Sequence, residues 1–258
     1  MAKKRDGDGA ARLSDAELLR LGRWNTPTIY NGWEQITRRD SAKECFNPEE
    51  TRDFCPEMGP MCGYAVTLVV GPSRRGPIQE QPGAWLDFFK YLAGVPGRKV
   101  VVCQDLDKPD FVGTFCGEVT AGIYRALGCV GAVIDGAVRD LDEVKAVGFK
   151  VLASRLCIGH AQAWPLRWDC PVEVFGRKVR PGDLIHADKH GFMAIPAEDQ
   201  PGLLDAAAFM DGNELDTVIA AGRASAGRTR DEIVAALADA SARFNAAVAK
   251  KFGRRGEW

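Results

Sequence analysis

The sequence has no long apolar run, and none of its hydrophobic stretches approaches the roughly 20 residues that a membrane-spanning helix needs. Its first ten residues are polar and glycine-rich, and they lack the apolar segment of a signal peptide. A frayed terminus is a better interpretation of this segment than a basic targeting arm. We therefore expect a cytoplasmic protein with no membrane partner.

The chain also lacks an excess of charge of either sign. Its 34 basic and 35 acidic residues give a formal net charge of −1. No global field would gather a phosphate backbone or anionic lipid, so nucleic acid is not an expected partner. The 46% hydrophobic and 27% charged residues are typical of a globular protein rather than a disordered one.

Paired cysteines are missing as well. The eight cysteines form no C-x-x-C pair, and no secretory signal accompanies them, so they are expected to be reduced thiols. Cys103 and Cys129 lie in apolar, strand-like runs, where a small hydrophobic residue is expected rather than a nucleophile. There is no interior linker, charge block or internal repeat, which favours one main domain with terminal extensions.

The middle of the chain alternates between helix and strand. Helices are expected at 85–92, 118–127 and 141–147, and strands at 64–70, 100–103, 130–134 and 150–153. Gly128 and Gly148 are expected to end the last two of these helices. Crossovers this short predict parallel neighbouring strands and an α/β fold.

The two ends of the chain are predicted to differ from its middle. Ser14 to Glu17 forms a capping box for a first helix, and Thr26-Pro27 is expected to cap a second helix that runs towards Ile36. After Pro171 short antiparallel strands are expected. Thr229 to Glu232 is another capping box, before a helix with one apolar face formed by Ile233, Leu237, Ala240, Phe244 and Val248.

The most informative segment is the apolar strand that ends in Asp135-Gly136 and leads to Arg139-Asp140, just before a helix. Ligands of open α/β sheets bind at the carboxyl ends of strands. A cation beside a helix N-terminus opposes the helix dipole at a cost of roughly 0.3–1 kcal/mol, so Arg139 is best explained by an anion that it binds. Asp140 has a structural alternative, because with Glu143 it forms a capping box.

A second segment, Gly117 to Gly122, opens the preceding helix. Free backbone N–H groups at such a start can receive a carboxylate or a phosphate. As a bare glycine pattern this signal is weak, and an ordinary helix start with an acidic first turn is the favoured interpretation of it.

These segments together resemble the RraA-like family, which includes the 4-hydroxy-4-methyl-2-oxoglutarate aldolases. The resemblance rests on Gly117-Glu118, the Ala-Leu-Gly ending at Gly128, and Gly131-Ala-Val-Ile-Asp-Gly-Ala-Val-Arg-Asp140. Other segments follow in the family's order: 26–30, 63–70, 148–151, 171–174, 179–183 and 187–196. The resemblance divides the chain into an N-terminal extension (1–23), a catalytic domain (24–200) and a helical C-terminal extension (201–258).

The resemblance implies an α/β/β layered fold with helical N- and C-terminal extensions. It also implies a homotrimer, which in some members pairs into a hexamer, with a pyruvate site in a cleft between subunits.

Position by position, the resemblance assigns Arg139 to the oxygens of a 2-oxo acid and Asp140 to a Mg²⁺ or Mn²⁺ ion. Glu118 takes the place of the family's usual aspartate in the metal shell. The substrate carboxylate is expected on Gly117 and the backbone of Val119, Thr120 and Ala121.

This assignment is chemically consistent. Cleavage of a C–C bond next to a 2-oxo group leaves an enolate, which a hard divalent ion stabilises. Mg²⁺ keeps several waters, so Asp140 and Glu118 suffice as ligands, and Arg139 would add preorganised positive charge. The extra methylene of Glu118 is a departure that shifts the metal or makes its ligation water-mediated.

Other polar residues are weaker candidates. His186, Asp188 and His190 lie where the family's aldolases commonly have acidic residues, and they are candidates for a second metal site or a proton donor. The favoured interpretation is that they satisfy a tight turn. His160 either lines a specificity pocket near Trp164 and Trp168 or is structural, and Asp135 is a further candidate.

The sequence therefore predicts a divalent-metal-dependent lyase that cleaves or decarboxylates a small 2-oxo acid through a pyruvate enolate. Aldolase and decarboxylase activity stay open as alternatives, because both pass through the same enolate. A different class also stays open: a non-catalytic protein-binding regulator, since the family's namesake inhibits a ribonuclease. A methyltransferase would need a Gly-rich loop directly after a first strand, which the sequence lacks.

Overall fold

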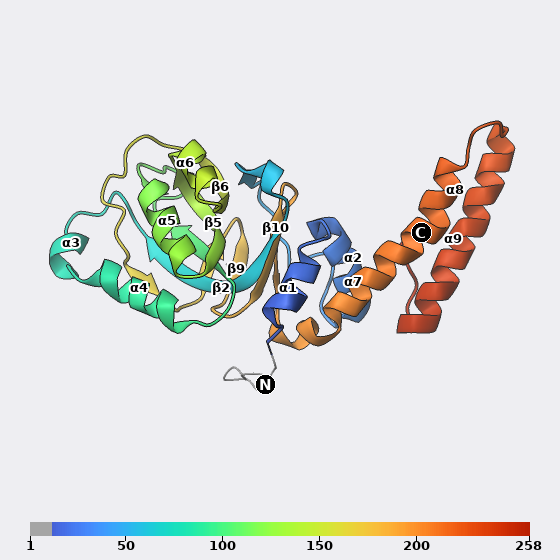
Figure 1. The fold of residues 1–258 in the computed structure, drawn as a ribbon, viewed down its shortest axis with the longest axis horizontal. Coiled ribbons are helices and arrows are strands. Elements are labelled where there is room, and N and C mark those ends of the chain that lie inside the picture. The colour runs from blue at the N-terminus through green and yellow to red at the C-terminus, as the bar shows by residue number, and fades with distance from the viewer. Residues whose placement is uncertain (1–11) are drawn as a thin grey trace.

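The computed structural model describes residues 12–258, so the expectations for the first ten residues lie outside it (Figure 1). A nine-stranded mixed sheet forms the centre of the molecule, in the order β1-β6-β5-β3-β2-β10-β11, with β4 beside β5 and β7 beside β2. A separate hairpin, β8–β9, forms a second, small sheet.

The middle of the large sheet is parallel, as predicted. It consists of β2 (Met61–Val70), β3 (Lys99–Asp105), β5 (Cys129–Val138) and β6 (Lys150–Leu156). The apolar runs of these strands are buried on both faces, which is typical of parallel strands under crossover helices. β2 ends where predicted, at Val70, whereas β3, β5 and β6 extend past their predicted ends. The extension of β5 to Val138 brings it up to Arg139.

The remaining strands lie at the two sides of this parallel core. β10 (Leu184–Asp188) and β11 (Gly191–Ile195) form the predicted antiparallel pair, and β10 pairs with β2. The other strands are short: β1 (Arg52–Asp53), β4 (Thr114–Cys116), β7 (Arg167–Trp168), β8 (Val172–Val174) and β9 (Arg177–Val179). Of these, β1, β4 and β7 were not predicted.

Helices cover one face of the sheet and the small hairpin covers the other. α4 (Ala84–Gly94), α5 (Glu118–Ala126) and α6 (Leu141–Ala146) bury one apolar cluster, and the β8–β9 hairpin buries a second cluster on the opposite face. A one-turn helix, α3 (Pro77–Glu80), precedes α4. The predicted α/β/β layering is confirmed.

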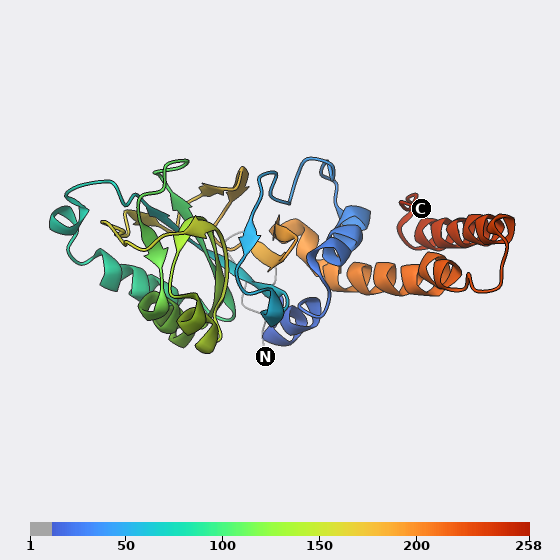
Figure 2. The ribbon, with the colours of Figure 1, turned by 90° about the horizontal axis from the view of Figure 1, so that it is seen from above.

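The helical extensions lie beyond the β10–β11 side of the sheet. α1 (Asp15–Leu21) and α2 (Thr26–Ile36) pack there with α7 (Gln200–Glu214). Helix α7 runs on through a π-helical turn (Leu215–Ile219) and α8 (Ala220–Arg223), and α9 (Arg230–Phe252) folds back along it. This helical pair projects away from the sheet (Figures 1 and 2). The division at residues 23 and 200 stays a prediction.

Local signals account for most helix ends. The capping boxes at Ser14 and Thr229 are both formed, and Gly128 and Gly148 adopt the positive φ that ends α5 and α6. One expectation was wrong: α2 is capped by Asn25, whose side chain accepts the Thr28 N–H at 2.9 Å, and not by Thr26-Pro27. Asparagine is a stronger N-cap residue than threonine.

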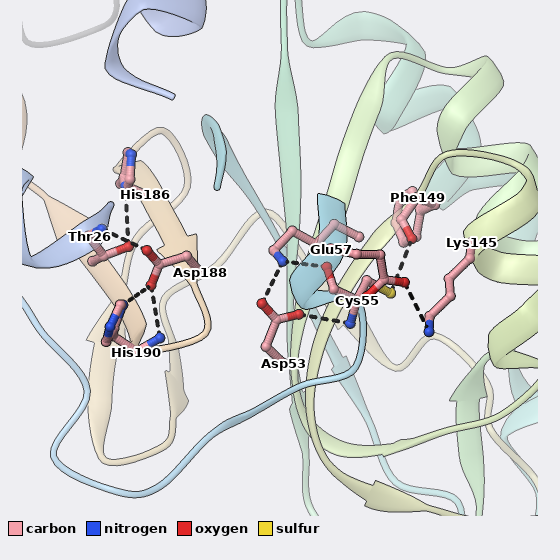
Figure 3. Close-up of polar contacts among 10 residues, drawn as sticks. Thr26, Asp53, Cys55, Glu57, Lys145, Phe149, His186, Asp188 and His190 are labelled. Carbon is pink, nitrogen blue, oxygen red and sulfur yellow. Dashed lines mark hydrogen bonds and ion pairs between the residues drawn. The ribbon is translucent and has the colours of Figure 1, made fainter. Parts of the chain in front are cut away.

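A buried ion pair links β1 to β6 of the sheet. Lys150 Nζ lies 2.6 Å from Asp53 Oδ2 and also donates to the Cys55 carbonyl, and both charged side chains are almost fully buried. Asp53 in turn accepts the Cys55 N–H (Figure 3). Nearby, Lys145 on α6 pairs with Glu57 of the short 3₁₀ turn Pro56–Met58.

The cysteine prediction is confirmed within the described residues. All eight cysteines are free, and Cys103 and Cys129 are fully buried as small apolar residues. Burial raises the pKa of the Cys129 thiol to about 12, which makes it a poor nucleophile. Between residues 12 and 258, no helix combines the length and apolar character needed to cross a bilayer.

Candidate functional site

The carboxyl end of β5 places Arg139 and Asp140 beside the start of α5. Short β4 leads into α5, and Arg139 N donates to the Cys116 carbonyl at 3.0 Å, so the two chain segments are joined. Gly117 allows this close approach, since a Cβ there would lie 2.4 Å from Asp140 Oδ2 and 3.1 Å from Arg139 Cγ. The two motifs that the sequence singled out therefore meet at one site.

Asp140 has a different structural role from the one proposed as its alternative. Its backbone is left-handed (φ 55°), and its side chain does not cap α6, so the capping box with Glu143 is absent. Instead, Asp140 Oδ2 accepts the Glu118 N–H at 3.1 Å, at the start of α5. Residues with a short polar side chain tolerate this backbone conformation, which turns the carboxylate towards α5 rather than along α6.

The first turn of α5 offers two free donors. Glu118 N–H is used by Asp140, and Ala121 N–H is donated to the Gly117 carbonyl. The N–H groups of Val119 and Thr120 lie in the first turn, where no carbonyl of the helix is four residues earlier. They have no partner among the described residues. Of the predicted carboxylate-binding amides, these two remain available to an anion.

Arg139 is held in place but not fully satisfied. Its Nη1 donates to the Ile158 carbonyl at 3.1 Å, and its Nε lies 3.4 Å from Asp140 Oδ2. That Nε is buried and makes no hydrogen bond to any residue of the described chain. A buried unsatisfied donor is unusual in a native structure, and a bound ligand is one explanation of it.

Arg139 and Asp140 line a cavity of about 320 Å³. This is near the lower end of the roughly 300–1,000 Å³ typical of small-molecule sites. Its polar lining comprises Thr114, Thr120, Arg139, Asp140, His160 and Gln162. The structure therefore places Gly117, Val119, Thr120, Arg139, Asp140 and His160 of the predicted residues around one space.

A second part of the cavity lining, called the aromatic wall below, was missed by the sequence analysis, except for Trp164. It is apolar and consists of Ile78, Trp85, Phe115 and Trp164. The rings of Trp85 and Phe115 stack at 5.5 Å, and Trp164 meets Trp85 edge-on at 6.1 Å. These residues come from α3, α4, β4 and the loop after β6, and no local pattern indicates that they converge.

The donor set fits a hard divalent ion that keeps most of its waters. Asp140 has one carboxylate oxygen engaged by Glu118 N–H and one left over. The Glu118 side chain is exposed, has no partner in the described chain and is not among the residues that line the cavity, so it would reach an ion from outside it. From residue 12 onward, no group of three or more His, Cys, Asp or Glu side chains is placed to share a metal. One or two carboxylates with water and substrate suit Mg²⁺ or Mn²⁺, whereas a site ligated wholly by protein is not formed.

Asp135 lies away from this cavity. Its buried carboxylate accepts hydrogen bonds from Lys108 Nζ at 2.7 Å, Phe175 N at 2.7 Å and Ser154 Oγ at 3.2 Å. It therefore connects β5 to the β8–β9 hairpin on the other face of the sheet, which is a structural role.

The histidine-rich turn also lies elsewhere, against α2 (Figure 3). Asp188 accepts the Thr26 N–H and the His190 N–H, both at 2.8 Å, and its other contact is His190 Nδ1 at 3.0 Å. Burial favours a higher pKa for Asp188, but these hydrogen bonds and the nearby His190 hold the pKa below its usual value. These contacts match the favoured interpretation, in which the residues satisfy a turn.

His186 is fully buried and engaged through both ring nitrogens. Its Nε2 lies 3.2 Å from the Leu21 carbonyl, so it carries the proton, and Nδ1 lies 3.0 Å from the Thr26 hydroxyl. Burial lowers the pKa of His186 to about 4 from its usual 6.5. Between these pH values the unfolded chain binds a proton at this residue and the folded chain does not.

We therefore expect His186 to weaken the fold as the pH falls from about 6.5 towards 4. Its share of the loss in unfolding free energy at about pH 5 is about 2 kcal/mol. Urea unfolding of the parent and of His186→Asn, at about pH 7.5 and about pH 5, measures this share. The variant should lose less stability on acidification.

The comparison between parent and variant is needed because Asp105 acts in the opposite direction. Burial raises the pKa of Asp105 to about 7, so its protonation favours the folded state over part of the same range. His160→Asn is the matched control, because His160 is exposed. Equal acid sensitivity of the parent and both variants would contradict the assignment.

Comparison with known proteins identifies the family. A model of the RraA-like family, described as Aldolase/RraA, matches residues 10–194. The chain belongs to the RraA-like family. The matched residues include β5, Arg139, Asp140 and the start of α5, so the cavity described above lies within the matched part of the chain.

Individual RraA-like relatives match only part of the chain at low sequence identity. A protein of Halalkalibacterium halodurans, named "Putative 4-hydroxy-4-methyl-2-oxoglutarate aldolase", is 30% identical over 141 residues, which cover 54% of this chain and 65% of the relative. The chain thus spans less than two thirds of that relative's length.

Two solved structures share the fold. One is an uncharacterized protein from Pseudomonas syringae pv. tomato, with a TM-score of 0.66 at 20% identity, covering 88% of this chain and 96% of the other. The second is an unusual member of the RNase ES inhibitor RraA protein family from Streptomyces coelicolor, with a TM-score of 0.61 at 21% identity, covering 83% and 96%.

Proposed function

We propose that this RraA-like protein is a divalent-metal-dependent carbon–carbon lyase that acts on a small 2-oxo acid through a pyruvate enolate. One observation carries the proposal: a guanidinium with an unsatisfied buried donor, a carboxylate and two free backbone N–H groups converge on one cavity. This set matches the parts of a 2-oxo acid, which has a carboxylate, a keto oxygen and a bond that breaks with charge moving towards that oxygen.

Each group has a defined task in this proposal. The N–H groups of Val119 and Thr120 bind the substrate carboxylate at the positive end of α5. Arg139 donates to the keto oxygen, where negative charge develops, and its existing bond to Ile158 fixes its direction beforehand. Asp140 and Glu118 would hold a Mg²⁺ or Mn²⁺ ion, which supplies further positive charge to the enolate.

The metal requirement gives the direct test. We expect excess chelator to abolish pyruvate release from 4-hydroxy-2-oxo acids and oxaloacetate, and added Mg²⁺ or Mn²⁺ to restore it. The readout is pyruvate, measured by a coupled assay over a panel of substrates. Full turnover in excess chelator would contradict the metal assignment.

We also propose a homotrimer, or a hexamer made of two trimers. Leu156 and Ile158, which are 48% and 94% exposed, line a second, open depression that shares Arg139 and Asp140 with the cavity. Exposed apolar side chains beside a charged site suit a neighbouring subunit. The long α9 helix offers further apolar surface through Val234, which is 66% exposed.

Light scattering on the purified protein should therefore give a mass of three or six chains. Ile158→Glu should shift the population towards smaller species, whereas Leu19→Glu, at an exposed position on α1, should not. A stable and active monomer would overturn this proposal.

The alternative function is a non-catalytic regulator that binds another protein, which would need the fold and its surface but not the cavity. The described relatives include both an aldolase name and a ribonuclease inhibitor family. The intact set of Arg139, Asp140 and free N–H groups favours the enzyme, because protein binding gives no reason to gather these groups around a cavity.

A further inference from the structure

The lining of the cavity has two chemically different parts. Arg139, Asp140 and the start of α5 supply the charged part. Trp85, Phe115 and Trp164 supply the aromatic wall. A substrate whose 2-oxo acid part binds the charged groups leaves the aromatic wall as the main apolar surface of the cavity for its C4 substituent.

The aromatic wall is a packed group of rings. Trp85 and Phe115 stack with an angle of only 3° between their planes, and Trp164 closes against Trp85 at 84°. The indole N–H of Trp164 is already donated to the Gln81 carbonyl at 2.9 Å, outside the substrate space. Phe115 is nearly fully buried, so this part of the wall is packed against the core.

The lining offers no second cation. Among the described residues that line the cavity, Arg139 is the single arginine or lysine, and in the proposed function it binds the 2-oxo acid part. A second substrate carboxylate would lose its water there without gaining a partner, and aromatic faces carry partial negative charge. His160 and Gln162 also line the cavity, and they suit the C4 hydroxyl of an aldol better than a full charge.

We infer that the preferred substrate is a 4-hydroxy-2-oxo monocarboxylic acid whose C4 substituent is apolar, with an aryl group as the best match. This inference rests on the proposed function and adds the substrate class. In the reaction, the C4 hydroxyl loses its proton and the C3–C4 bond breaks. C4 leaves as an aldehyde, the electron pair forms the pyruvate enolate, and C3 then takes up a proton to give pyruvate.

The test compares two substrates that differ in their C4 substituent. One is 4-hydroxy-2-oxo-4-phenylbutanoate, and the other is 4-hydroxy-2-oxoglutarate, which has a carboxylate in place of the phenyl group. We expect kcat/KM with Mg²⁺ to be at least about tenfold higher for the phenyl compound, because the aromatic wall gains its contacts and no charge is stranded.

A positive charge introduced into the aromatic wall should remove this preference. Trp164 is half-buried on a loop, so Trp164→Arg is expected to fold, which a thermal melt checks. It should lower the ratio of the two kcat/KM values by at least about tenfold. Leu86→Arg adds the same charge to an exposed position on α4 outside the cavity and should leave the ratio unchanged.

Exchange of the pyruvate methyl protons in D₂O, followed by NMR, tests the lyase function separately from the substrate class. This exchange requires enolate formation but no C4 substituent. If exchange occurs and the dicarboxylate is preferred, or if Trp164→Arg leaves the ratio unchanged, the substrate class is wrong and the lyase stands. If neither exchange nor cleavage occurs, the proposed function itself is overturned.

Discussion

Asp140→Asn should fold normally and lose activity on the order of a thousandfold. Asparagine tolerates the left-handed backbone of Asp140, and its amide oxygen can still accept the Glu118 N–H at the start of α5. What it loses is the negative charge that holds a divalent ion. A Lewis acid contributes several kcal/mol to such a reaction, and each 1.36 kcal/mol corresponds to a factor of ten in rate.

Two further variants make the result specific. Asp140→Ala removes the charge, the acceptor for Glu118 N–H and the residue type suited to φ 55°, so it should also lose about 1–2 kcal/mol of stability. Glu143→Gln, on the exposed side of α6, should change neither property, because the structure shows no capping box there. Pyruvate release and thermal melting are measured on all three. Parental activity of folded Asp140→Asn would remove Asp140 from the site.

Arg139→Lys should also fold, and its turnover should fall by about a hundredfold or more. Lysine keeps the charge but has no planar fork, so it cannot bond the Ile158 carbonyl and a substrate oxygen in fixed directions at once. The loss should appear mainly in kcat if the contact tightens as charge develops in the transition state.

Arg125→Lys is the matched control, since Arg125 is exposed on α5 and lies outside the cavity. It should retain parental kinetics. If folded Arg139→Lys releases pyruvate at the parental rate, the site is misplaced, and the regulator that binds another protein becomes the better explanation.

Local sequence patterns predicted the elements of this fold well, because their causes are local. Strands β2, β3 and β5 are continuous apolar runs, since they are buried on both faces, and the capping boxes at Ser14 and Thr229 depend on residues three apart. The parallel arrangement followed from crossover length. The short strands β1, β4 and β7 were not predicted, because two or three residues carry no periodicity and pair only when a neighbouring strand is present.

For the site, the sequence identified Arg139 and Asp140 and the start of α5, because a strand end followed by a helix start is a local signal with a physical meaning. It did not determine what the Asp140 side chain does. The same residues are compatible with a cap on α6 and with an acceptor for Glu118 N–H, and the left-handed backbone together with the close approach at Gly117 decides for the second.

The aromatic wall is the part of the site that the sequence did not predict. Trp85, Phe115 and Trp164 are separated by tens of residues, and in the sequence each is an ordinary large apolar side chain. The sequence by itself determined which ends of strands and helices carry charge, since charge placed against a helix dipole is visible locally. Only the tertiary structure decided what shares a cavity with that charge, because the packing of α4, β4 and the loop after β6 against one another brings distant rings together.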